Sequence, residues 1–222
     1  MKTTAIIVAA GSGSRFNSET PKQFLDLLGR PVVAHSIARF MEAPSVDAVV
    51  LVVARQQLEK YAPKSFSKPF LIAEGGATRA HSVLNGLQAV PAGTTIVAVH
   101  DGARPLVSVA EIERVIETAK QTGAACLVAP ITDTIKSIND GKIDATLDRT
   151  KLRRALTPQA FDLALLKRAF ENAELSDNVT DECFLVERLA HGIAIVEGSP
   201  RNIKITHADD LVLAKALLKQ NA

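Results

Sequence analysis

The chain has 222 residues, of which 47% are hydrophobic, 4% aromatic and 23% charged. This length suits one large domain, and the composition does not require a second, so we expect a single domain over residues 1–222. The net charge of +2 is scattered, with no basic tail and no basic-aromatic interleaving, which argues against nucleic-acid binding. No apolar run is long enough to cross a bilayer, which argues against membrane association.

Two cysteines, Cys126 and Cys183, lie among apolar neighbours and lack CxxC spacing. This pattern is typical of buried thiols in a reducing compartment, with a disulfide or a metal pair as the less common alternative. The first predicted strand begins close to Met1, which leaves no room for a signal peptide. We therefore expect a cytoplasmic protein.

The first predicted element is a strand over 5–9 (AIIVA), whose β-branched residues indicate burial on both faces of a parallel sheet. The chain then enters 10–15 (AGSGSR), where small residues let the backbone approach a ligand. A loop of this kind after a first strand offers N–H groups to a phosphate. Arg15 and Lys22 add two cations, so the segment predicts a polyphosphate site.

Two better-known phosphate motifs do not fit these glycines. The P-loop requires Lys followed by Ser or Thr, which this spacing lacks, and the dinucleotide fingerprint requires a glycine where Phe16 stands. An ordinary turn with surface charges is the alternative interpretation.

Strands and helices alternate along the first 130 residues. This alternation predicts an α/β, Rossmann-like fold with a mostly parallel sheet and helices on both faces. Ligands of such sheets bind at the carboxyl ends of the strands. The expected strands are 47–54, 70–73, 95–99 and 124–129, and the expected helices are 31–41, 78–90 and 108–122, the last with Ser108 and Glu111 at capping-box spacing.

Residues 131–155 are polar and alternating, with an Asn-Asp-Gly turn at 139–141 that is typical of a hairpin. A projecting β-arm that contacts another subunit and a plain surface hairpin are both open interpretations. Beyond it, we expect the chain to pass through 156–159 directly into a helix over 161–172. A helix near Thr180, strands over 193–196 and 202–205, and a helix over 207–219 should follow.

Several polar residues lie at the ends of these strands. Asp101 follows a buried strand, which suits a Mg²⁺ shared by protein and triphosphate, although a turn aspartate is the simpler alternative. Arg104 can bind a phosphate in bidentate fashion, and His100 is expected to be structural. Lys204 is either an exposed lysine or a third cation over the phosphates.

Gly75 and Gly76, with Arg79 and Ser82 on the next turns, can let a base or ribose approach the backbone, but a tight turn into a helix explains them equally well. Thr180 has an alternative role as a helix N-cap. Other polar loop positions stand out only beside a template; they are Thr134, Lys136, Arg149, Thr157, Asp181 and Glu182.

A family resemblance supplies that template. The segments AAGSGSRF, PKQF, GGATRAHSV, VHDGARP, TDTIK, ALTPQ, TDE and VEGSPRNIKIT occur in the order found in 2-C-methyl-D-erythritol 4-phosphate cytidylyltransferases of the non-mevalonate isoprenoid pathway. The chain resembles this family over essentially its whole length. The resemblance implies a nucleotide-diphospho-sugar-transferase fold, a homodimer joined through the β-arm, Mg²⁺ or another divalent cation, and transfer of CMP from CTP to methylerythritol phosphate.

The resemblance also implies roles for individual residues. The cations around the α-phosphate are Arg15, Lys22 and Lys204. The nucleotide contacts are Ala9, Ala10, Gly11, Gly76 and Ser82, with Asp101 associated with the metal. The methylerythritol-phosphate contacts are Arg104, Thr134, Thr157 and Thr180, and Arg149 reaches the partner subunit's site.

Some features leave alternatives open. Ala77 stands where members of the family often carry an acidic residue, so one nucleotide contact is missing or made by backbone. Ribitol-5-phosphate cytidylyltransferases share the fold but usually have a glycine where Ala10 stands, and a non-catalytic nucleotide sensor is a third possibility. Some relatives carry a fused cyclodiphosphate synthase domain; this chain is too short for one, so we expect a single activity.

Overall fold

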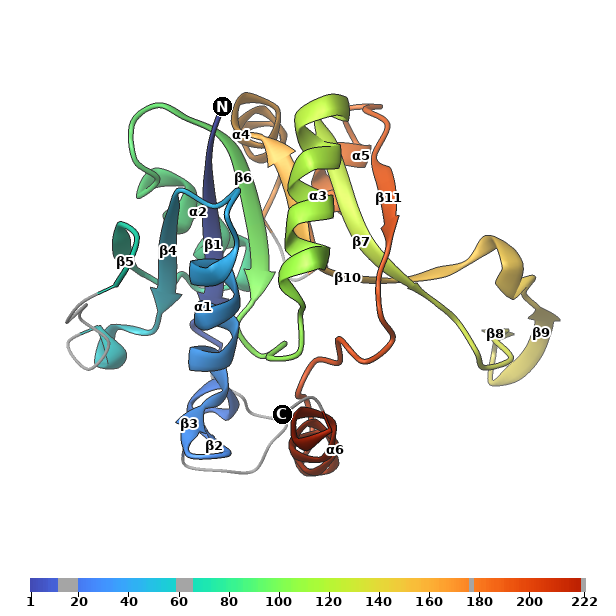
Figure 1. Cartoon of the computed structure of the whole chain (residues 1–222). Coiled ribbons are helices and arrows are strands. Elements are labelled where there is room, and N and C mark those ends of the chain that lie inside the picture. The colour runs from blue at the N-terminus through green and yellow to red at the C-terminus, as the bar shows by residue number, and fades with distance from the viewer. Residues whose placement is uncertain (12–19, 59–65, 176–177, 221–222) are drawn as a thin grey trace.

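The computed structural model describes residues 1–11, 20–58, 66–175 and 178–220 (Figure 1). Within them, a seven-stranded sheet has the order β11-β7-β10-β6-β1-β4-β5. Its strands are β1 (Lys2–Ala9), β4 (Ala48–Val53), β5 (Phe70–Glu74), β6 (Thr94–Asp101), β7 (Ala124–Pro130), β10 (Arg153–Asp162) and β11 (Ala194–Glu197).

The sheet is mixed but mostly parallel. Strand β1 pairs in parallel with β4 and β6, β4 with β5, and β7 with β11, whereas β10 runs antiparallel to both of its neighbours, β6 and β7. The predicted fold class is confirmed. The carboxyl ends of β1, β4 and β6 point to the edge opposite the N-terminus (Figure 1).

Helices cover both faces of the sheet (Figure 1). α1 (Val32–Glu42) and α3 (Val109–Thr122) pack on one face, and α2 (Arg79–Gln88), α4 (Leu163–Glu171) and α5 (Glu182–Glu187) pack on the other. Successive β1 residues alternate between the two cores, so Ile7 lies with the first group of helices and Ile6 with the second. Both are fully buried, and burying a side chain of this size stabilises the fold by about 2 kcal/mol.

The predicted capping box of α3 is present. The Ser108 hydroxyl accepts from the Glu111 N–H at 3.2 Å, and the Glu111 carboxylate accepts from the Ser108 N–H at 2.8 Å. The other Glu111 oxygen accepts from the Ser199 N–H at 2.7 Å. The start of α3 therefore also anchors the loop that follows β11.

Two sequence predictions were wrong. Residues 156–159 do not lead directly into a helix; they lie inside β10, which inserts between β6 and β7, and α4 begins only at Leu163. Pro158 argued against a strand in the sequence, because proline cannot donate a hydrogen bond to a β-ladder. In the structure, the register of β10 with β7 is broken between Ala155 and Gln159. Residues 202–205 form no strand and instead belong to an irregular loop.

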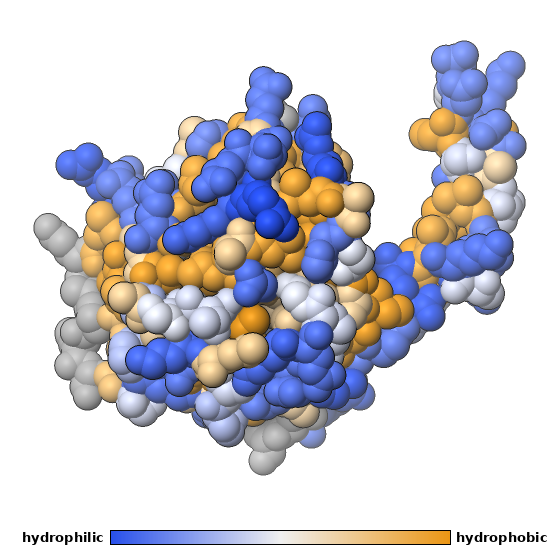
Figure 2. Space-filling view, turned by 90° about the horizontal axis from the view of Figure 1, so that it is seen from above, coloured by the Kyte–Doolittle hydropathy of each residue, from blue (hydrophilic) through white to orange (hydrophobic). Residues whose placement is uncertain are grey.

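The expected β-arm is present. It consists of β8 (Lys136–Asn139) paired antiparallel with β9 (Lys142–Thr146), and both Asp140 and Gly141 have the positive φ that tight hairpin turns require. Figures 1 and 2 show the arm standing clear of the remainder of the molecule. Its apolar side chains Ile138, Ile143 and Leu147 are 74%, 67% and 41% exposed.

The last helix, α6 (Ala208–Lys219), packs on a small hairpin formed by β2 (Asp26–Leu27) and β3 (Arg30–Pro31). A third apolar cluster joins Leu27, Val32, Ile205 and Ala214 there. Single 3₁₀ turns occupy Lys22–Phe24, Arg55–Gln57 and Arg149–Lys151. None of the helices in the described ranges is both long and apolar enough to span a membrane.

Candidate active site

The candidate site centres on Asp101, the last residue of β6. Its side chain is 9% exposed, and cations from three segments surround it. Arg79 Nε donates to Oδ1 at 3.0 Å, and Lys204 Nζ lies 2.9 Å from Oδ2. Arg104 Nε lies 3.5 Å from Oδ2, close enough for an ion pair but without hydrogen-bond geometry.

This arrangement keeps Asp101 ionised. Burial alone would raise the carboxyl pKa, but Arg79, Lys204 and Arg104 outweigh it and hold the pKa well below its ordinary value. Burial lowers the pKa of the Arg104 guanidinium, against the opposing effect of Asp101. The site therefore carries more positive than negative charge at neutral pH, which favours an anionic ligand.

A second carboxylate, Glu182, joins the cluster through Arg79. Arg79 Nη1 and Nη2 donate to the two Glu182 oxygens at 2.7 and 3.0 Å. The Glu182 side chain has no exposed surface. Burial disfavours the Arg79 cation, yet Glu182 and Asp101 together raise its pKa above the ordinary value. Burial raises the pKa of Glu182, against the opposing effect of Arg79.

His100 and Thr157 support the Asp101 backbone. The Thr157 hydroxyl accepts from the Asp101 N–H at 3.1 Å and lies 3.0 Å from His100 Nδ1. His100 Nε2 lies 3.1 Å from the Arg104 carbonyl oxygen; because a carbonyl only accepts, Nε2 carries the proton and the hydroxyl donates to Nδ1. Complete burial lowers the His100 pKa to about 4, so the ring is a neutral structural group, as the sequence predicted.

Lys204 lies on a loop without regular structure, and long-range contacts fix that loop. The Asn202 amide donates to the Thr157 carbonyl at 2.9 Å, and Arg104 Nη1 donates to the Asn202 carbonyl at 2.9 Å. The Ile205 N–H donates to the Ala103 carbonyl at 2.8 Å. The backbone of Lys204 is thereby held in place, while its side chain is 37% exposed and pairs with Asp101.

Glycines form the adjoining surface at the ends of β1 and β5. A Cβ on Gly75 would lie 2.2 Å from Ala10 Cβ, and one on Gly76 would lie 2.4 Å from His81 Cβ. The Gly76 N–H donates to the Ser82 hydroxyl at 3.0 Å. These contacts draw the predicted nucleotide residues Ala10, Gly76 and Ser82 together.

Gln23 holds the end of β1. Its amide donates to the carbonyls of Ala9 and Gly11, each at 2.7 Å. Gln23 follows Lys22 in the same 3₁₀ turn. The turn that carries Lys22 is thereby anchored beside the predicted nucleotide loop.

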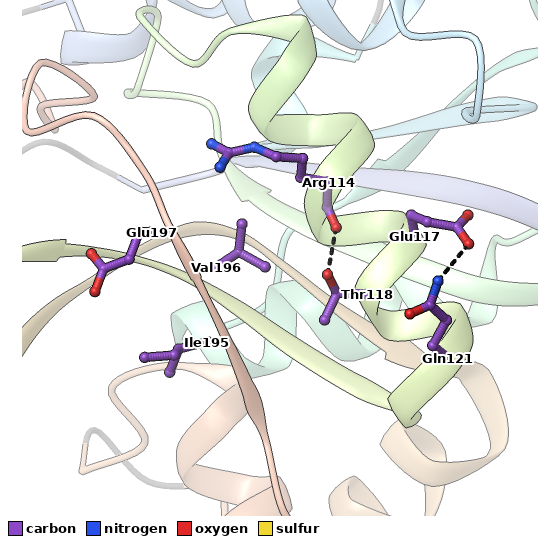
Figure 3. A pocket seen from close by; sticks show the side chains of 7 residues that line it. All are labelled: Arg114, Glu117, Thr118, Gln121, Ile195, Val196 and Glu197. Carbon is purple, nitrogen blue, oxygen red and sulfur yellow. Dashed lines mark hydrogen bonds between the residues drawn. The ribbon is translucent and has the colours of Figure 1, made fainter.

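A second hollow is separate from this cluster. Figure 3 shows it between α3 and β11, lined by Arg114, Glu117, Thr118, Gln121, Ile195, Val196 and Glu197. Two of its polar side chains bond within α3, Gln121 to Glu117 at 3.0 Å and Thr118 to the Arg114 carbonyl at 2.8 Å. Since it contains none of the predicted site residues, the Asp101 cluster is the stronger candidate.

Comparison with known proteins agrees with the geometry. The sequence model of the 2-C-methyl-D-erythritol 4-phosphate cytidylyltransferase family matches residues 3–220. The chain belongs to this family. Relatives of that name from Desulforamulus reducens and Syntrophotalea carbinolica are 42% and 43% identical to it, over 97% and 98% of this chain and 95% and 97% of theirs.

Solved structures of cytidylyltransferases superpose over almost the full length. The 4-diphosphocytidyl-2C-methyl-D-erythritol synthase of Anaerococcus prevotii has a TM-score of 0.86 at 29% identity, covering 98% of both chains. The 2-C-methyl-D-erythritol 4-phosphate cytidylyltransferase of Thermus thermophilus has a TM-score of 0.81 at 34% identity, covering 99% of this chain and 100% of that one.

Four further residues are implied by the cytidylyltransferase resemblance, namely Arg15, Thr134, Arg149 and Thr180. Arg15 falls outside the described residues. Thr134 and Arg149 belong to the arm, away from the carboxyl end of β6, and Arg149 Nη1 donates to the Thr132 carbonyl at 2.5 Å. Thr180 is exposed beside α5, but the N-cap is Asp181, whose carboxylate accepts from the Phe184 N–H.

Sequence reasoning did not assign the Arg79–Glu182 pair. Both residues were noted as polar positions, but no spacing rule joins side chains 103 positions apart. The only local signals are that Arg79 is the first residue of α2, three positions after Gly76, and that Glu182 directly follows the N-cap of α5.

The described residues contain no cluster of three or more His, Cys, Asp and Glu side chains that could by itself hold a metal ion. Asp101 is a single carboxylate beside a cationic surface, and the neighbouring cations hold its pKa low. Mg²⁺ that accompanies a nucleoside triphosphate is usually held by one or two carboxylates plus the phosphates. The residues therefore fit a metal of this shared kind.

Proposed function

We propose that this chain transfers CMP from CTP to 2-C-methyl-D-erythritol 4-phosphate, giving 4-diphosphocytidyl-2-C-methyl-D-erythritol and pyrophosphate in the non-mevalonate isoprenoid pathway. The observation that carries the proposal is the Asp101 cluster, where Arg79, Arg104 and Lys204 meet at the carboxyl end of β6 in a member of the cytidylyltransferase family.

The acceptor phosphate oxygen attacks the α-phosphorus of CTP in line, and pyrophosphate leaves. A phosphate is already ionised at neutral pH, so the reaction needs no general base. Catalysis depends on positioning and on stabilising negative charge at the α-phosphate. We assign this charge stabilisation to Arg15, Lys22 and Lys204; the exposed part of Lys204 lets its ammonium turn from Asp101 to a phosphate.

Asp101 is the residue that would hold Mg²⁺ or another divalent cation together with the triphosphate. When bound, the ion neutralises phosphate charge. The lowered pKa of the Asp101 carboxyl supports this role, because a metal ligand of this type must be deprotonated.

The remaining site residues divide between the two substrates. We assign the nucleotide to Ala9, Ala10, Gly11, Gly76 and Ser82. We assign the methylerythritol phosphate to Arg104, Thr134, Thr157 and Thr180, with Arg149 supplied by a second subunit. The hydroxyl of Thr157 already bonds with His100 and the Asp101 N–H. Its contribution to binding is therefore to fix the backbone at this side of the site.

We also infer a homodimer joined through the β-arm and a cytoplasmic location. The exposed Ile138 and Ile143 support the dimer, because a lone arm leaves apolar side chains in water. The free thiols of Cys126 and Cys183 support the location, since neighbouring cysteines that stay unpaired are typical of a reducing compartment.

A substrate comparison tests the reaction. Pyrophosphate release should require CTP together with methylerythritol phosphate and should be much slower with ribitol 5-phosphate. Faster release with ribitol 5-phosphate would identify the sister enzyme. CTP binding without release in the presence of either acceptor would indicate a nucleotide sensor.

Variants of two cations test the mechanism. Lys22→Ala and Arg15→Ala should each lower kcat by about 100-fold, by analogy with loss of an oxyanion-hole donor, and change the KM for CTP far less. Lys167→Ala, an exposed lysine of α4, is the matched control and should retain normal kcat. Near-normal turnover of both active-site variants would refute the assigned role.

A further inference from the structure

The two oxygens of Asp101 have separate partners. Oδ1 accepts from Arg79 Nε at 3.0 Å, whereas Oδ2 faces Lys204 at 2.9 Å and Arg104 at 3.5 Å. A carboxylate on a free χ2 torsion can interchange its oxygens. Because the two oxygens of an ionised carboxylate are equivalent, such a flip changes nothing; what Arg79 can fix is the plane of the carboxylate, and hence the direction of the oxygen that faces Lys204 and Arg104.

Arg79 is fixed by Glu182. Two parallel hydrogen bonds of 2.7 and 3.0 Å join the guanidinium to the Glu182 carboxylate, and they leave Nε directed at Asp101. A bidentate arginine fork constrains direction as well as distance. A lysine at this position would satisfy charge but could not bridge both carboxylates in one fixed plane.

Glu182 is itself held from both sides. Gln159, which is 1% exposed in the middle of β10, donates to Asp181 at 2.8 Å and accepts from the Cys183 N–H at 3.2 Å. These are the residues before and after Glu182. Gln159 therefore holds the residues on either side of Glu182, Glu182 holds Arg79, and Arg79 holds Asp101.

Stability alone explains this network poorly. Burying charges costs several kcal/mol for each ion, and replacing a buried ion pair with apolar residues is often neutral or stabilising. The network instead connects three segments that must keep one geometry, namely the start of α2, the end of β6 and the start of α5. Orientation of Asp101 is the property that apolar residues could not reproduce.

We propose that Arg79, held by Glu182, is a positioning residue that fixes the plane of the Asp101 carboxylate, so that the oxygen not bound by Arg79 faces the reacting phosphates and their metal ion. This role rests on the proposed cytidylyl transfer. It adds to that reaction two residues that contact Asp101 or each other rather than the reacting atoms.

Two conservative variants test the role. Glu182→Gln keeps the shape but loses the charged fork, and Arg79→Lys keeps the charge but loses the bridge. Each should lower kcat by about 10- to 100-fold, the usual cost of losing a partner of a metal ligand, and raise the Mg²⁺ concentration for half-maximal rate by about 10-fold. The KM for methylerythritol phosphate should change little. Glu42→Gln, which breaks the exposed Arg39–Glu42 pair, should leave all three parameters unchanged.

A binding measurement separates this role from the reaction itself. Calorimetry of CTP binding should show a gain in affinity on adding Mg²⁺ to the wild type, and that gain should shrink about 10-fold in Glu182→Gln, while affinity measured in EDTA stays the same. If wild-type protein binds CTP with Mg²⁺ but releases no pyrophosphate, the proposed function fails and the positioning role is still tested by binding.

Chemical rescue distinguishes the positioning role of Arg79 from a purely structural role. Arg79→Ala leaves a gap beside Asp101, and the wild-type side chain is 23% exposed, so guanidinium ion can enter. Millimolar guanidinium should restore kcat by roughly 5-fold or more, because its planar fork can replace the lost bridge, and methylammonium should not. Unchanged kcat and Mg²⁺ dependence in Glu182→Gln, or a loss of thermal stability without a loss of kcat in Arg79→Lys, would overturn the proposal.

Discussion

Asp101 illustrates how a single buried carboxylate can organise a cationic site. Taking a carboxylate out of water is unfavourable, and three neighbouring cations compensate for it. Two of those cations face the same oxygen, Oδ2, at 2.9 and 3.5 Å. If Lys204 turns to a phosphate, as proposed, Arg79 and Arg104 remain beside Asp101 to keep its pKa low.

His100 gives the stability of the fold a defined pH dependence. Its pKa is lowered to about 4 in the folded chain by burial, against about 6.5 when unfolded. Between these values the unfolded chain binds a proton that the folded chain does not. Stability from this group is therefore complete above pH 6.5 and falls as pH drops towards 4, by about 3 kcal/mol in all.

Urea unfolding at several pH values between about 4 and 7 measures this effect. His100→Gln should reduce the slope of unfolding free energy against pH in that range, whatever its effect at neutral pH. Equal slopes in His100→Gln and the wild type would contradict the assignment of a buried neutral imidazole.

At the scale of elements, the segments that follow β1 and β5 approach each other closely. Gly75 lies where its N–H donates to the Val53 carbonyl at 2.8 Å and where a side chain would meet Ala10. The segments that follow β1 and β5 therefore leave no room for a methyl group between them. This proximity forms the surface assigned to the nucleotide.

Gly75→Ala should therefore act on nucleotide binding. A Cβ 2.2 Å from Ala10 Cβ forces the end of β1 to move, at a cost of about 1–3 kcal/mol in stability, and we expect the Kd for CTP to rise by roughly 10-fold or more. Denaturation and calorimetry measure the two effects. Gly192→Ala is the control, because a Cβ there meets no atom within 4 Å. CTP affinity equal to wild type in Gly75→Ala would show that this approach is not needed.

At the scale of the whole molecule, the arm is the feature whose apolar side chains remain exposed within the described part of its own chain. It stands clear of the remaining structure (Figure 2), and the residues assigned to substrate on it, Thr134 and Arg149, are exposed. An arm that reaches a neighbouring subunit would bring these residues to a second copy of the Asp101 cluster. Each site would then be built from two chains.

Mixing inactive variants tests this shared site. Arg149→Ala and Lys22→Ala chains should each be nearly inactive, but heterodimers of the two should regain one working site, since the intact Lys22 and the intact Arg149 then meet. A Lys22→Ala and Lys204→Ala mixture should show no recovery, because both residues belong to the same half-site. If heterodimers form and Arg149→Ala gains no activity from them, the arm serves its own chain.

Local chemistry explains which elements could be predicted. Runs of β-branched residues marked β1 and β4, Ser108 and Glu111 marked the start of α3, and Asp140-Gly141 marked the arm. Strand β10 was missed because Pro158 interrupts its hydrogen-bond ladder. Residues 202–205 were mistaken for a strand because an irregular segment that packs on an apolar cluster can also alternate polar and apolar residues.

The sequence by itself determined the alternation of strands and helices over the first 130 residues and the family, and it proposed the site residues that lie within its motifs. Only the tertiary structure decided that β10 lies antiparallel between β6 and β7, that Glu182 holds Arg79 against Asp101, and that Lys204 reaches the same carboxylate from an irregular loop. The physical reason is separation along the chain. Propensity and periodicity act over a few neighbouring residues, whereas these contacts join residues up to 103 positions apart and exist only after the sheet has brought the segments together.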